Sequence, residues 1–337
     1  MSNMMYRAAV LSTIMEEMER DPNVVVLGED VVGGMGTEGG PEAIGGIWST
    51  STGLYDRFGA NRVIDTPISE SAIVGAAAGL ALSGKRPIAE LMFADFIGVS
   101  LDQIWNQIAK FRYMFGGKTR CPAVIRMAYG AGYNAAAQHS QSVHQILTGM
   151  PGLKVVMPTT PADVKGLLRT AIRDDDPVIF LEHKALYATT GEVPDDRDFM
   201  IPFGHARLSR AGGDVTIISS GLLLGMCEAV ADKLSAEGIG CDVIDLRTTS
   251  PLDEEAILDS VEVTGRVVVV DEAPPRCGLG ADLCALVAEK AFSSLKAPPL
   301  QVTPPHTPIP FARELESAYL PSVDKIEAAV RRVLAWR

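Results

Sequence analysis

The chain has 337 residues, of which 47% are hydrophobic and 21% are charged, and its formal net charge is −12. This length predicts about two domains of ordinary size, and the composition is typical of a globular protein with large cores. The acidic balance argues against nucleic acid and against anionic membranes as partners, because both are bound through clustered lysine and arginine.

Cysteine usage and the N-terminus indicate the compartment. The five cysteines are odd in number and form no Cys-x-x-Cys pair, which predicts reduced thiols and not a disulfide framework or a zinc site. Residues 1–10 hold no apolar signal region, and no apolar run approaches the ~20 residues that a membrane-spanning helix needs. We therefore expect a cytoplasmic protein.

The first 188 residues alternate between helical patterns and short apolar runs, an order typical of an α/β domain. Helices are predicted over Met4–Arg20, Ser71–Gly84, Leu101–Tyr113 and Pro161–Arg173. Strands of a parallel sheet are predicted over Val24–Leu27, Arg62–Ile64, Pro87–Phe93, Ala123–Met127, Leu153–Met157 and Pro177–Glu182.

Residues 189–204, rich in acidic residues and proline, predict a linker. A second α/β pattern occupies residues 205–337, with strands predicted over Val215–Ser219, Cys241–Leu246 and Arg266–Val270. Its predicted helices are Leu222–Glu237, Leu252–Val261, Ala281–Ser293 and Val323–Leu334. The expected architecture is therefore two doubly wound α/β domains, 1–188 and 205–337.

The stretch Asp65-Thr-Pro-Ile-Ser-Glu70 joins a strand to a helix of small and apolar residues. Ser69 is predicted to cap this helix, and the positive end of the helix dipole favours the Glu70 carboxylate. The helix is expected to be buried, with Gly75 and Gly79 allowing another backbone to approach closely. On this stretch alone, an ordinary capping carboxylate is the simpler interpretation of Glu70, and a functional carboxylate is the alternative.

Glu29 follows a predicted strand at the sheet edge where ligands of open α/β sheets bind. The glycine-rich loop after it, residues 33–53, is expected to lie at a site or an interface. It contains Gly34-x-Gly36-x-x-Gly39, but no helix opening follows this dinucleotide-like pattern, so nicotinamide binding is disfavoured. Gly79–Lys85 resembles a phosphate-binding loop but lacks the Ser or Thr that must follow the lysine.

His139 follows a strand and a flexible loop, in Gln138-His139-Ser140-Gln141. Imidazole titrates near neutral pH, so His139 is a candidate for proton transfer, with a hydrogen-bonded loop histidine as the alternative. His144 is not spaced from it like a helical metal pair, and no nearby carboxylate completes a triad. The acidic turn 174–176 is either a cation site or a solvated turn.

Several motifs occur in order and at characteristic spacing: Asp65-Thr-Pro-Ile-Ser-Glu70, Phe93-Ala-Asp-Phe96, Gln138-His139-Ser140-Gln141, Pro151-Gly-Leu-Lys-Val155 and Asp245-Leu-Arg-Thr-Thr249. Together they resemble the β subunit of the thiamine-diphosphate-dependent first component of 2-oxo acid dehydrogenase complexes. The resemblance runs nearly from end to end. It implies a transketolase-like pyrimidine-binding domain followed by the transketolase C-terminal domain.

The resemblance also implies roles for individual residues. Glu70 would exchange a proton with the pyrimidine ring of thiamine diphosphate, so that its thiazolium carbon can attack a substrate carbonyl. Phe96 would stack on that ring, and His139 would assist proton transfer and acyl transfer to a lipoyl group. The rest of the implied cofactor pocket is Glu29, Ile68, Ser69 and Met92. A monovalent cation, K⁺, would be bound by Ala123, Ala171, Ile172, Asp174 and Asp176, where Asp176 replaces a frequent asparagine.

The chain lacks the Gly-Asp-Gly…Asn-Asn signature that holds the diphosphate and Mg²⁺ in thiamine enzymes. The resemblance therefore implies a separate α subunit that supplies it, in an α2β2 heterotetramer with Gly75 and Gly79 at a subunit contact. A lipoylated dihydrolipoyl acyltransferase core is the further implied partner.

Three stretches look most similar to acetoin dehydrogenases: Gly45–Trp48, Lys110–Lys118 and Pro305–Phe311. They imply cleavage of acetoin to acetaldehyde and a hydroxyethyl adduct of the cofactor, followed by transfer of the acetyl group to lipoamide. Oxidative decarboxylation of pyruvate or of a branched-chain 2-oxo acid is the alternative. A catalytically silent α/β scaffold subunit is the non-enzymatic alternative.

Overall fold

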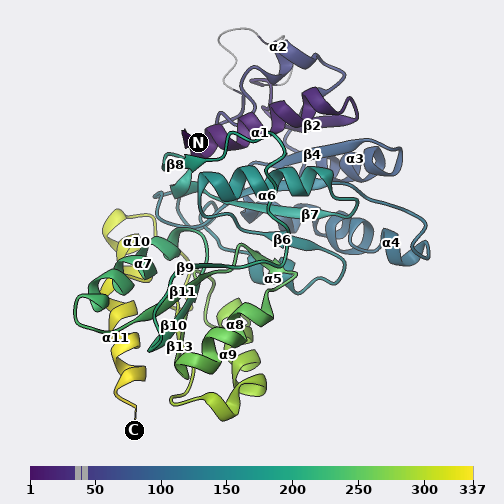
Figure 1. Cartoon of the computed structure of the whole chain (residues 1–337). Helices are drawn as coiled ribbons and strands as arrows, with labels where there is room; N and C mark the ends of the chain where they lie inside the picture. Colours follow the sequence, from purple (N-terminus) through teal and green to yellow (C-terminus); the bar gives the residue numbers. More distant parts are fainter. Residues whose placement is uncertain (35–38, 40–44, 337) are drawn as a thin grey trace. The chain divides into compact units, whose positions relative to one another are not determined.

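The computed structural model of the chain describes residues 1–34, 39 and 45–336. The chain forms two compact units (Figure 1). The first comprises residues 1–129 and 146–203, and the second comprises residues 130–145 and 204–337. None of the helices in the described part is both long and apolar enough to cross a membrane.

The first unit is built on parallel strands in the order β6-β7-β5-β4-β2-β3. Every residue of the central strands β5 and β7 is buried. This burial on both faces is the reason that the strands appear as continuous apolar runs in the sequence. The strand bounds are β2 (Val24–Glu29), β3 (Val63–Thr66), β4 (Arg86–Leu91), β5 (Val124–Tyr129), β6 (Lys154–Val156) and β7 (Val178–His183).

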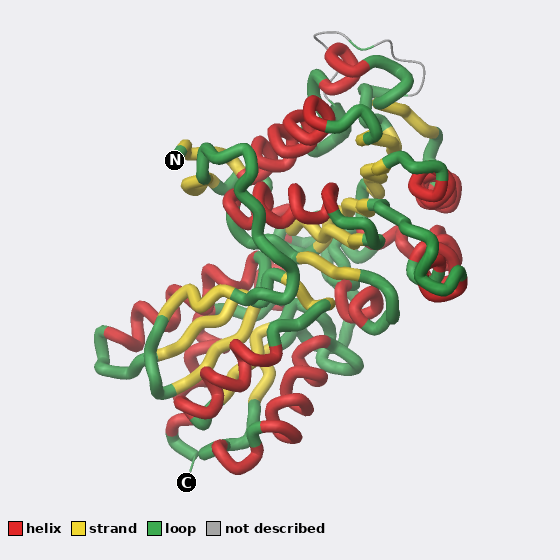
Figure 2. Tube along the Cα trace, turned by 45° about the vertical axis from the view of Figure 1, so that its right-hand side comes forward, coloured by secondary structure: helices red, strands yellow, loops and turns green. Residues whose placement is uncertain are grey.

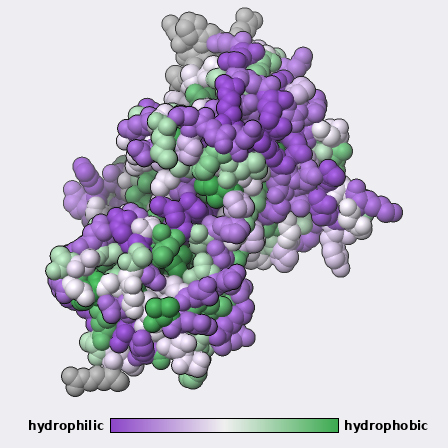
Figure 3. Space-filling view, viewed as in Figure 1, coloured by the Kyte–Doolittle hydropathy of each residue, from purple (hydrophilic) through white to green (hydrophobic). Residues whose placement is uncertain are grey.

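Two long helices of the first unit, α1 (Tyr6–Arg20) and α6 (Pro161–Arg173), lie side by side (Figure 1). Glu17 of α1 is 1% exposed and lies 2.8 Å from the guanidinium of Arg173 on α6. Arg169, which is fully buried, bonds Glu16 at 2.5 Å. Ion pairs between charged side chains therefore connect these two helices. On the face shown in Figure 3, the surface of the first unit is mostly hydrophilic.

The remaining elements of the first unit are shorter. They are β1 (Ser2–Met5), α2 (Leu54–Phe58), α3 (Glu70–Leu82), η1 (Ala94–Ser100), η2 (Gln103–Ile108), α4 (Phe111–Met114), η3 (Lys184–Leu186) and β8 (Thr190–Val193). The single helix predicted over Leu101–Tyr113 is wrong in detail, because its middle is a π-helix in which Ala109 N bonds Ile104 O at 3.1 Å. The wider turn keeps both Ile104 and Ile108 buried.

The second unit has the strand order β14-β13-β10-β11-β9, with only the edge strand β9 antiparallel among these described strands. Helices α7 and α11 form one apolar cluster with the sheet and helices α8 and α9 form another, so the strands lie between two helical layers (Figures 1 and 2). The bounds are β9 (Arg207–Arg210), β10 (Val215–Ser219), α7 (Leu222–Ser235), β11 (Cys241–Asp245), β12 (Thr248–Ser250), α8 (Glu254–Thr264), β13 (Val267–Val270), α9 (Leu279–Lys290), η4 (Phe292–Ser294), β14 (Leu300–Val302), α10 (Arg313–Tyr319) and α11 (Val323–Leu334).

The predicted fold class, two α/β domains with helices on both faces of a mainly parallel sheet, is confirmed. Two segments that connect the main elements pack as follows. Residues 130–145 group with the second unit, and α5 (His144–Thr148) begins within them. The stretch 189–204 contains β8, which pairs antiparallel with β1, because an extended chain beside an open strand edge satisfies its backbone groups there.

Helix α3 departs from two expectations. Ser69 stands at its N-cap, but within the described chain its hydroxyl accepts no capping bond, since its ψ of 75° is far from extended. Only one face of the helix is buried, and Ala72, Ala76 and Gly79 are exposed. A Cβ built at Gly79 meets no described atom within 4 Å, so the close backbone neighbour expected there is not part of the described chain.

Candidate active site

The ends of β2, β3 and β4 bring the predicted cofactor residues to one edge of the first sheet. Glu29 pairs in register with Thr66, and Gly28 pairs with both Asp65 and Glu90. Because all three strands are parallel, their carboxyl ends open on the same side, where ligands of such sheets bind. Gly28 is required here, since a Cβ at this position would lie 2.8 Å from the carbonyl oxygen of Glu90.

Glu29 and Glu70 form an electrostatically coupled pair at this edge. Burial raises the pKa of Glu29, and the neighbouring charges of Asp30 and Glu70 raise it further. Glu70 is the first residue of α3, where the helix dipole stabilises a negative charge. The site therefore holds a carboxylate with a raised pKa, Glu29, beside a second carboxylate at a helix N-terminus, an arrangement suited to proton exchange with a bound group.

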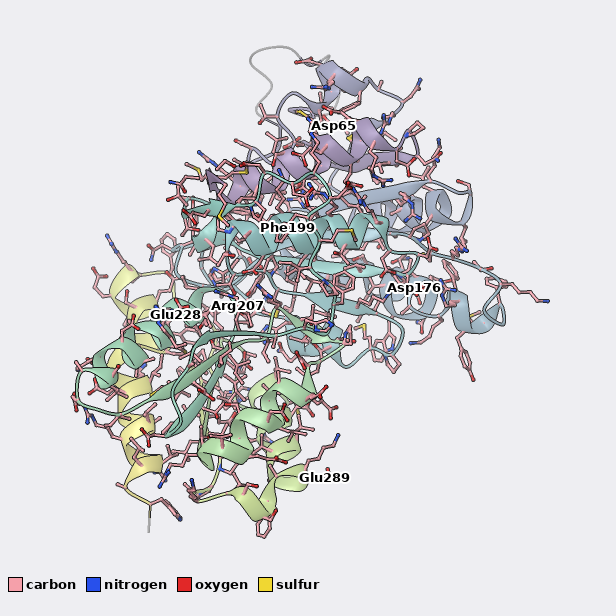
Figure 4. All side chains as sticks on the ribbon, viewed as in Figure 1. Asp65, Asp176, Phe199, Arg207, Glu228 and Glu289 are labelled. Atoms are coloured by element: carbon pink, nitrogen blue, oxygen red, sulfur yellow. The ribbon has the colours of Figure 1, made fainter. Side chains whose placement is uncertain are left out.

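Asp65 fixes the loop that follows β2, a role that the sequence alone did not assign. Its two carboxylate oxygens accept from the backbone N–H groups of Val32 at 2.6 Å and Gly34 at 3.1 Å. Burial raises the pKa of Asp65, and these two N–H groups partly offset the rise by favouring the charged form. Figure 4 labels Asp65 in the first unit. Asp65 thus connects the ends of β2 and β3 beside Glu29.

Aromatic and apolar side chains lie on the segment after β4. The rings of Phe93 and Phe96 meet edge to face at 6.2 Å, and Trp48 packs on Phe93 at 5.5 Å. The indole N–H of Trp48 donates to the carbonyl of Met92 at 3.1 Å, so the Gly45–Trp48 loop is fastened to this segment. Both Phe96 and Met92 are half-buried. They offer an aromatic face and a flexible apolar side chain to a flat ring.

Ile68 is 76% exposed, directly before the helix that carries Glu70. Helix α3 and the segment after β4 meet where the Ser71 hydroxyl donates to the carbonyl of Val99. Ile68 lies two residues before Glu70, and α3 packs against η1, which carries Phe96. This combination of apolar, aromatic and acidic groups suits an amphipathic aromatic ligand that covers the apolar groups and engages the charged ones. The residues present therefore fit the aminopyrimidine of thiamine diphosphate.

A buried ion cluster supports this edge from inside the sheet, and the sequence analysis missed it. Arg126 lies between Glu90 and Glu182, with hydrogen bonds of 2.7 Å to Glu90 and 2.7 and 2.8 Å to Glu182. Thr50 and Tyr187 donate to the two carboxylates at 3.1 and 3.0 Å. Burial alone would lower the pKa of Arg126, but Glu182 and Glu90 raise it well above the usual range, so the arginine stays charged. The sequence signal for this cluster is that Glu90, Arg126 and Glu182 interrupt strands that are otherwise mostly apolar.

His139 belongs to the second unit, in the loop 130–143 that precedes α5. It is half-buried, and its backbone N–H donates to the carbonyl of Ala136 at 3.4 Å. The sequence analysis found no carboxylate partner for His144. In the structure, Nε2 of the buried His144 lies 2.9 Å from Oδ1 of Asp271, a residue 127 positions away.

The predicted cation-site residues come together in the first unit at Asp176, far from Asp65 (Figure 4). Positively charged side chains already contact several oxygens of these residues. Arg86 donates to the carbonyls of Ile172 at 3.1 Å and Asp174 at 2.8 Å, and Lys154 bonds the Asp174 carboxylate at 2.6 Å. Arg112 pairs with Asp176. The carbonyl of Ala123 accepts from Val178 N at 2.9 Å, and that of Ala171 from Asp174 N at 3.3 Å.

Two further features of the sequence concern metal ions and dinucleotides. No cluster of three or more His, Cys, Asp or Glu suited to a metal ion occurs within residues 1–34, 39 and 45–336. The dinucleotide-like pattern Gly34-x-Gly36-x-x-Gly39 has its central glycine outside the described residues.

Comparison with known proteins places the chain in a family. Residues 2–190 match the transketolase pyrimidine binding domain and residues 204–326 match the transketolase C-terminal domain. The acetoin:2,6-dichlorophenolindophenol oxidoreductase subunit beta of Cupriavidus necator is 55% identical over 97% of this chain and 96% of its own length. Its Bacillus subtilis counterpart is 50% identical over 94% and 93%. The 2-oxoisovalerate dehydrogenase subunit beta of Bacillus subtilis is 44% identical over 99% of both chains.

A solved structure agrees in fold. A split-gene transketolase, described as an inactive beta4 tetramer, superposes with a TM-score of 0.77 over 99% of both chains at 24% identity. The family assignment rests on the two domain matches and on the full-length relatives. The chain belongs to the family of β subunits, each with a transketolase pyrimidine-binding and C-terminal domain, that includes those of the acetoin and 2-oxo acid dehydrogenases.

Proposed function

We propose that this chain is the β subunit of a thiamine-diphosphate-dependent enzyme that cleaves acetoin to acetaldehyde and passes the acetyl group to lipoamide on a dihydrolipoyl acyltransferase. The observation that carries the proposal is the coupled pair Glu29 and Glu70 at the edge of the first sheet. The substrate is proposed from the 55% identical relative, whose printed name specifies acetoin.

Thiamine diphosphate supplies a nucleophilic carbon and an electron sink when it is bound. Glu70 would hold and exchange a proton at the pyrimidine ring nitrogen. Glu29 would supply a second carboxylate beside the ring, with a pKa that is raised by burial and by the charges of Asp30 and Glu70. Phe96 would stack on the ring, and Ser69, Ile68 and Met92 would line the pocket and exclude water from the proton-exchange site.

The partners follow from what this chain lacks. Its sequence has no Gly-Asp-Gly…Asn-Asn signature, so an α subunit would hold the diphosphate and Mg²⁺. We propose an α2β2 heterotetramer in which the exposed small-residue face of α3, with Gly75 and Gly79, packs against another subunit. The names of the relatives, each a subunit beta, support this assembly. All five cysteines, which lie within the described residues, are free thiols, which supports a cytoplasmic location.

We also propose K⁺ as a ligand at Ala123, Ala171, Ile172, Asp174 and Asp176. The carbonyl oxygens at the C-terminal end of α6 support it, since the helix dipole is negative there. We expect K⁺ binding to change stability and rate only slightly. Arg86, Lys154 and Arg112 already contact the acidic turn 174–176 and neutralise part of its charge. Replacing KCl by NaCl at equal ionic strength tests this proposal: an unchanged melting temperature and rate would remove K⁺ from the account.

The decisive experiment reconstitutes the α/β pair with thiamine diphosphate and Mg²⁺ and follows reduction of dichlorophenolindophenol. Acetoin, pyruvate and 3-methyl-2-oxobutanoate are offered in parallel. The expected result is a preference for acetoin with release of acetaldehyde. A preference for an oxo acid with release of carbon dioxide would overturn the substrate and keep the cofactor and residues. Full turnover by the β chain alone would overturn the split site.

A further inference from the structure

The loop that carries His139 has an unusual backbone and needs an external restraint. Residues 130–143 form no helix or strand, and the loop closes where the N–H of Gly130 donates to the carbonyl of Gln141 at 3.3 Å. Asn134 and Ala136 have positive φ angles of 53° and 62°. Ala136 in this conformation is unfavourable, because its Cβ crowds the backbone, and it persists only where the surroundings impose it.

Glu316 supplies part of this restraint. This glutamate on α10 is 2% exposed. It accepts three hydrogen bonds of 2.9 Å from the loop, donated by the backbone N–H groups of Gly132 and Asn134 and by the side-chain amide of Asn134. An ionised carboxylate only accepts hydrogen bonds, and bonds from N–H groups to a charged acceptor are stronger than those to a neutral one. The N-terminal half of the loop is therefore fastened by one buried side chain.

Two more carboxylates hold the other contacts of the loop within the same unit. Glu272 accepts from the N–H of Ala131 at 2.6 Å and from the hydroxyl of Ser142 at 3.0 Å, so it joins the two ends of the loop. Asp271 bonds His144 at 2.9 Å. Ala131 is also buried against Tyr319 and Leu320 at the end of α10. The segment with His139 thus lies between two fixed flanks.

We propose that Glu316, together with Glu272, positions the His139 loop for acyl transfer to the lipoyl group. This inference rests on the proposed function. In that step the lipoyl disulfide is reduced while the substrate carbon is oxidised to the acetyl level: a carbon–sulfur bond forms and the S–S bond breaks. The second sulfur would take a proton from His139. His139 would regain a proton from the substrate hydroxyl as the carbonyl forms and the bond between the acetyl carbon and the cofactor breaks, with its electron pair returning to the cofactor.

The test is Glu316→Gln in the reconstituted α/β pair. Glutamine keeps the size of the side chain, but turns an amide donor toward the N–H groups of the loop. The dye assay needs no lipoyl thiol, since the dye is the oxidant and water takes the acetyl group. We expect the rate with a lipoylated acyltransferase domain to fall about 10–100-fold, with a much smaller change in the dye-linked rate. Glu314→Gln, an exposed neighbour on the same helix, is the matched control and should change neither rate.

Hydrogen exchange gives a readout that does not depend on activity. Amides of residues 130–145 should exchange faster in the Glu316→Gln pair, while the rest of the chain and the melting temperature stay as in the parent. Asn134→Gly is the second variant. It preserves the positive φ and removes only the amide contact, so it stays informative if the glutamate variant fails to fold, and it should show a smaller version of the same changes.

Several outcomes decide the proposal. In a His139→Ala background, Glu316→Gln should cause no further loss of lipoyl-linked rate. A parental lipoyl-linked rate in Glu316→Gln, or equal loss in both assays, would overturn the positioning role. Failure of the parent pair with every substrate would overturn the proposed function and the acyl-transfer role together. Faster hydrogen exchange in Glu316→Gln would then still establish that Glu316 restrains the loop 130–143.

Discussion

Glu29, at the end of β2, lies near Glu70, at the start of α3, and its pKa is raised by burial and by the charges of Asp30 and Glu70. Bringing the two carboxylates together weakens the folded chain at neutral pH, because the surroundings oppose the ionisation of Glu29 unless a ligand takes up part of its charge or shares its proton. The fold holds them together nevertheless, because parallel strands β2 and β3 end at the same sheet edge. We propose that the pair is kept for the ligand that binds at this edge, because its charges do not stabilise the folded chain.

Glu70→Gln should abolish most turnover and leave the fold intact. Glutamine fills the same space but cannot exchange a proton with a ring nitrogen, so the dye-linked rate of the α/β pair should fall about 10²–10⁴-fold. The melting temperature should change little, because Glu70 is only half-buried. Normal activity of this variant would favour the scaffold alternative, and the Glu314→Gln variant provides the control.

Glu29→Gln should stabilise the apo chain at neutral pH. A glutamate whose pKa is raised on folding costs stability above its folded pKa, and the cost disappears as pH falls toward the unfolded value of about 4. The variant should therefore melt higher than the parent at pH 7 and equally at pH 4, in thermal unfolding scans. The gain should shrink slightly in a Glu70→Gln background, since burial and Asp30 still raise the pKa of Glu29 there and only the smaller contribution of Glu70 is gone. A lower melting temperature at pH 7 would contradict this account.

Part of the site could be predicted from sequence because local rules govern it. Glu29 and Glu70 each follow an apolar strand, and strand ends of an α/β domain converge. Contacts between side chains and distant backbone groups were not predictable in this way. The partners of Asp65 are N–H groups of Val32 and Gly34, which no residue type identifies.

The buried ion cluster was in principle predictable. Glu90 and Arg126 interrupt apolar strands and are register partners across β4 and β5. Only the strand order, which sequence periodicity does not give, brings them together with Glu182. The pairing of His144 with Asp271 depends likewise on how residues 130–145 pack in the second unit.

Asp65→Asn should weaken the attachment of the loop after β2 and, through it, the binding of thiamine diphosphate. The asparagine keeps one acceptor oxygen, but turns an NH₂ group toward either Val32 or Gly34, so one buried N–H loses its partner at a cost of about 1–3 kcal/mol. We expect a lower melting temperature and a higher thiamine diphosphate concentration for half-maximal rate. Asp259→Asn, on the exposed face of α8, should change neither quantity. If Asp65→Asn left the thiamine diphosphate concentration for half-maximal rate unchanged, the loop after β2 would have no role in cofactor binding.

Arg126→Met should be among the most destabilising single substitutions in the first unit. It leaves Glu90 and Glu182, which are 4% and 0% exposed, without their shared cation. Removing one partner of a buried ion pair costs about 3–5 kcal/mol, because the remaining charge stays desolvated. Denaturant unfolding at pH 7 measures the loss, which should become smaller as pH is lowered, because burial raises the pKa of Glu182 and favours its neutral form. Arg120→Met removes an exposed ion pair with Asp175 and should cost below about 1 kcal/mol.

Asp271→Asn should destabilise the second unit at neutral pH but not in acid. Burial would raise the pKa of Asp271, but His144 and the N–H groups of Ala273 and Gly280 lower it below its usual range. A depressed folded pKa stabilises the folded state above the unfolded value of about 3.9, and this contribution is lost as pH falls through the folded pKa. The unfolding free energies of variant and parent should therefore differ at pH 7 and converge as pH falls through the lowered folded pKa of Asp271.

Loss of this anchor should also free one end of the His139 loop, so amides of residues 142–145 should exchange faster in Asp271→Asn at pH 7. Asp242→Asn is a useful comparison, because Asp242 also accepts a hydroxyl and a backbone N–H in the second unit, from Ser260 at 2.6 Å and Gly212 at 2.7 Å. It should destabilise the unit without altering exchange in the loop. A loss of stability in Asp271→Asn that persists unchanged at pH 3 would mean that packing, and not the charge of Asp271, anchors His144.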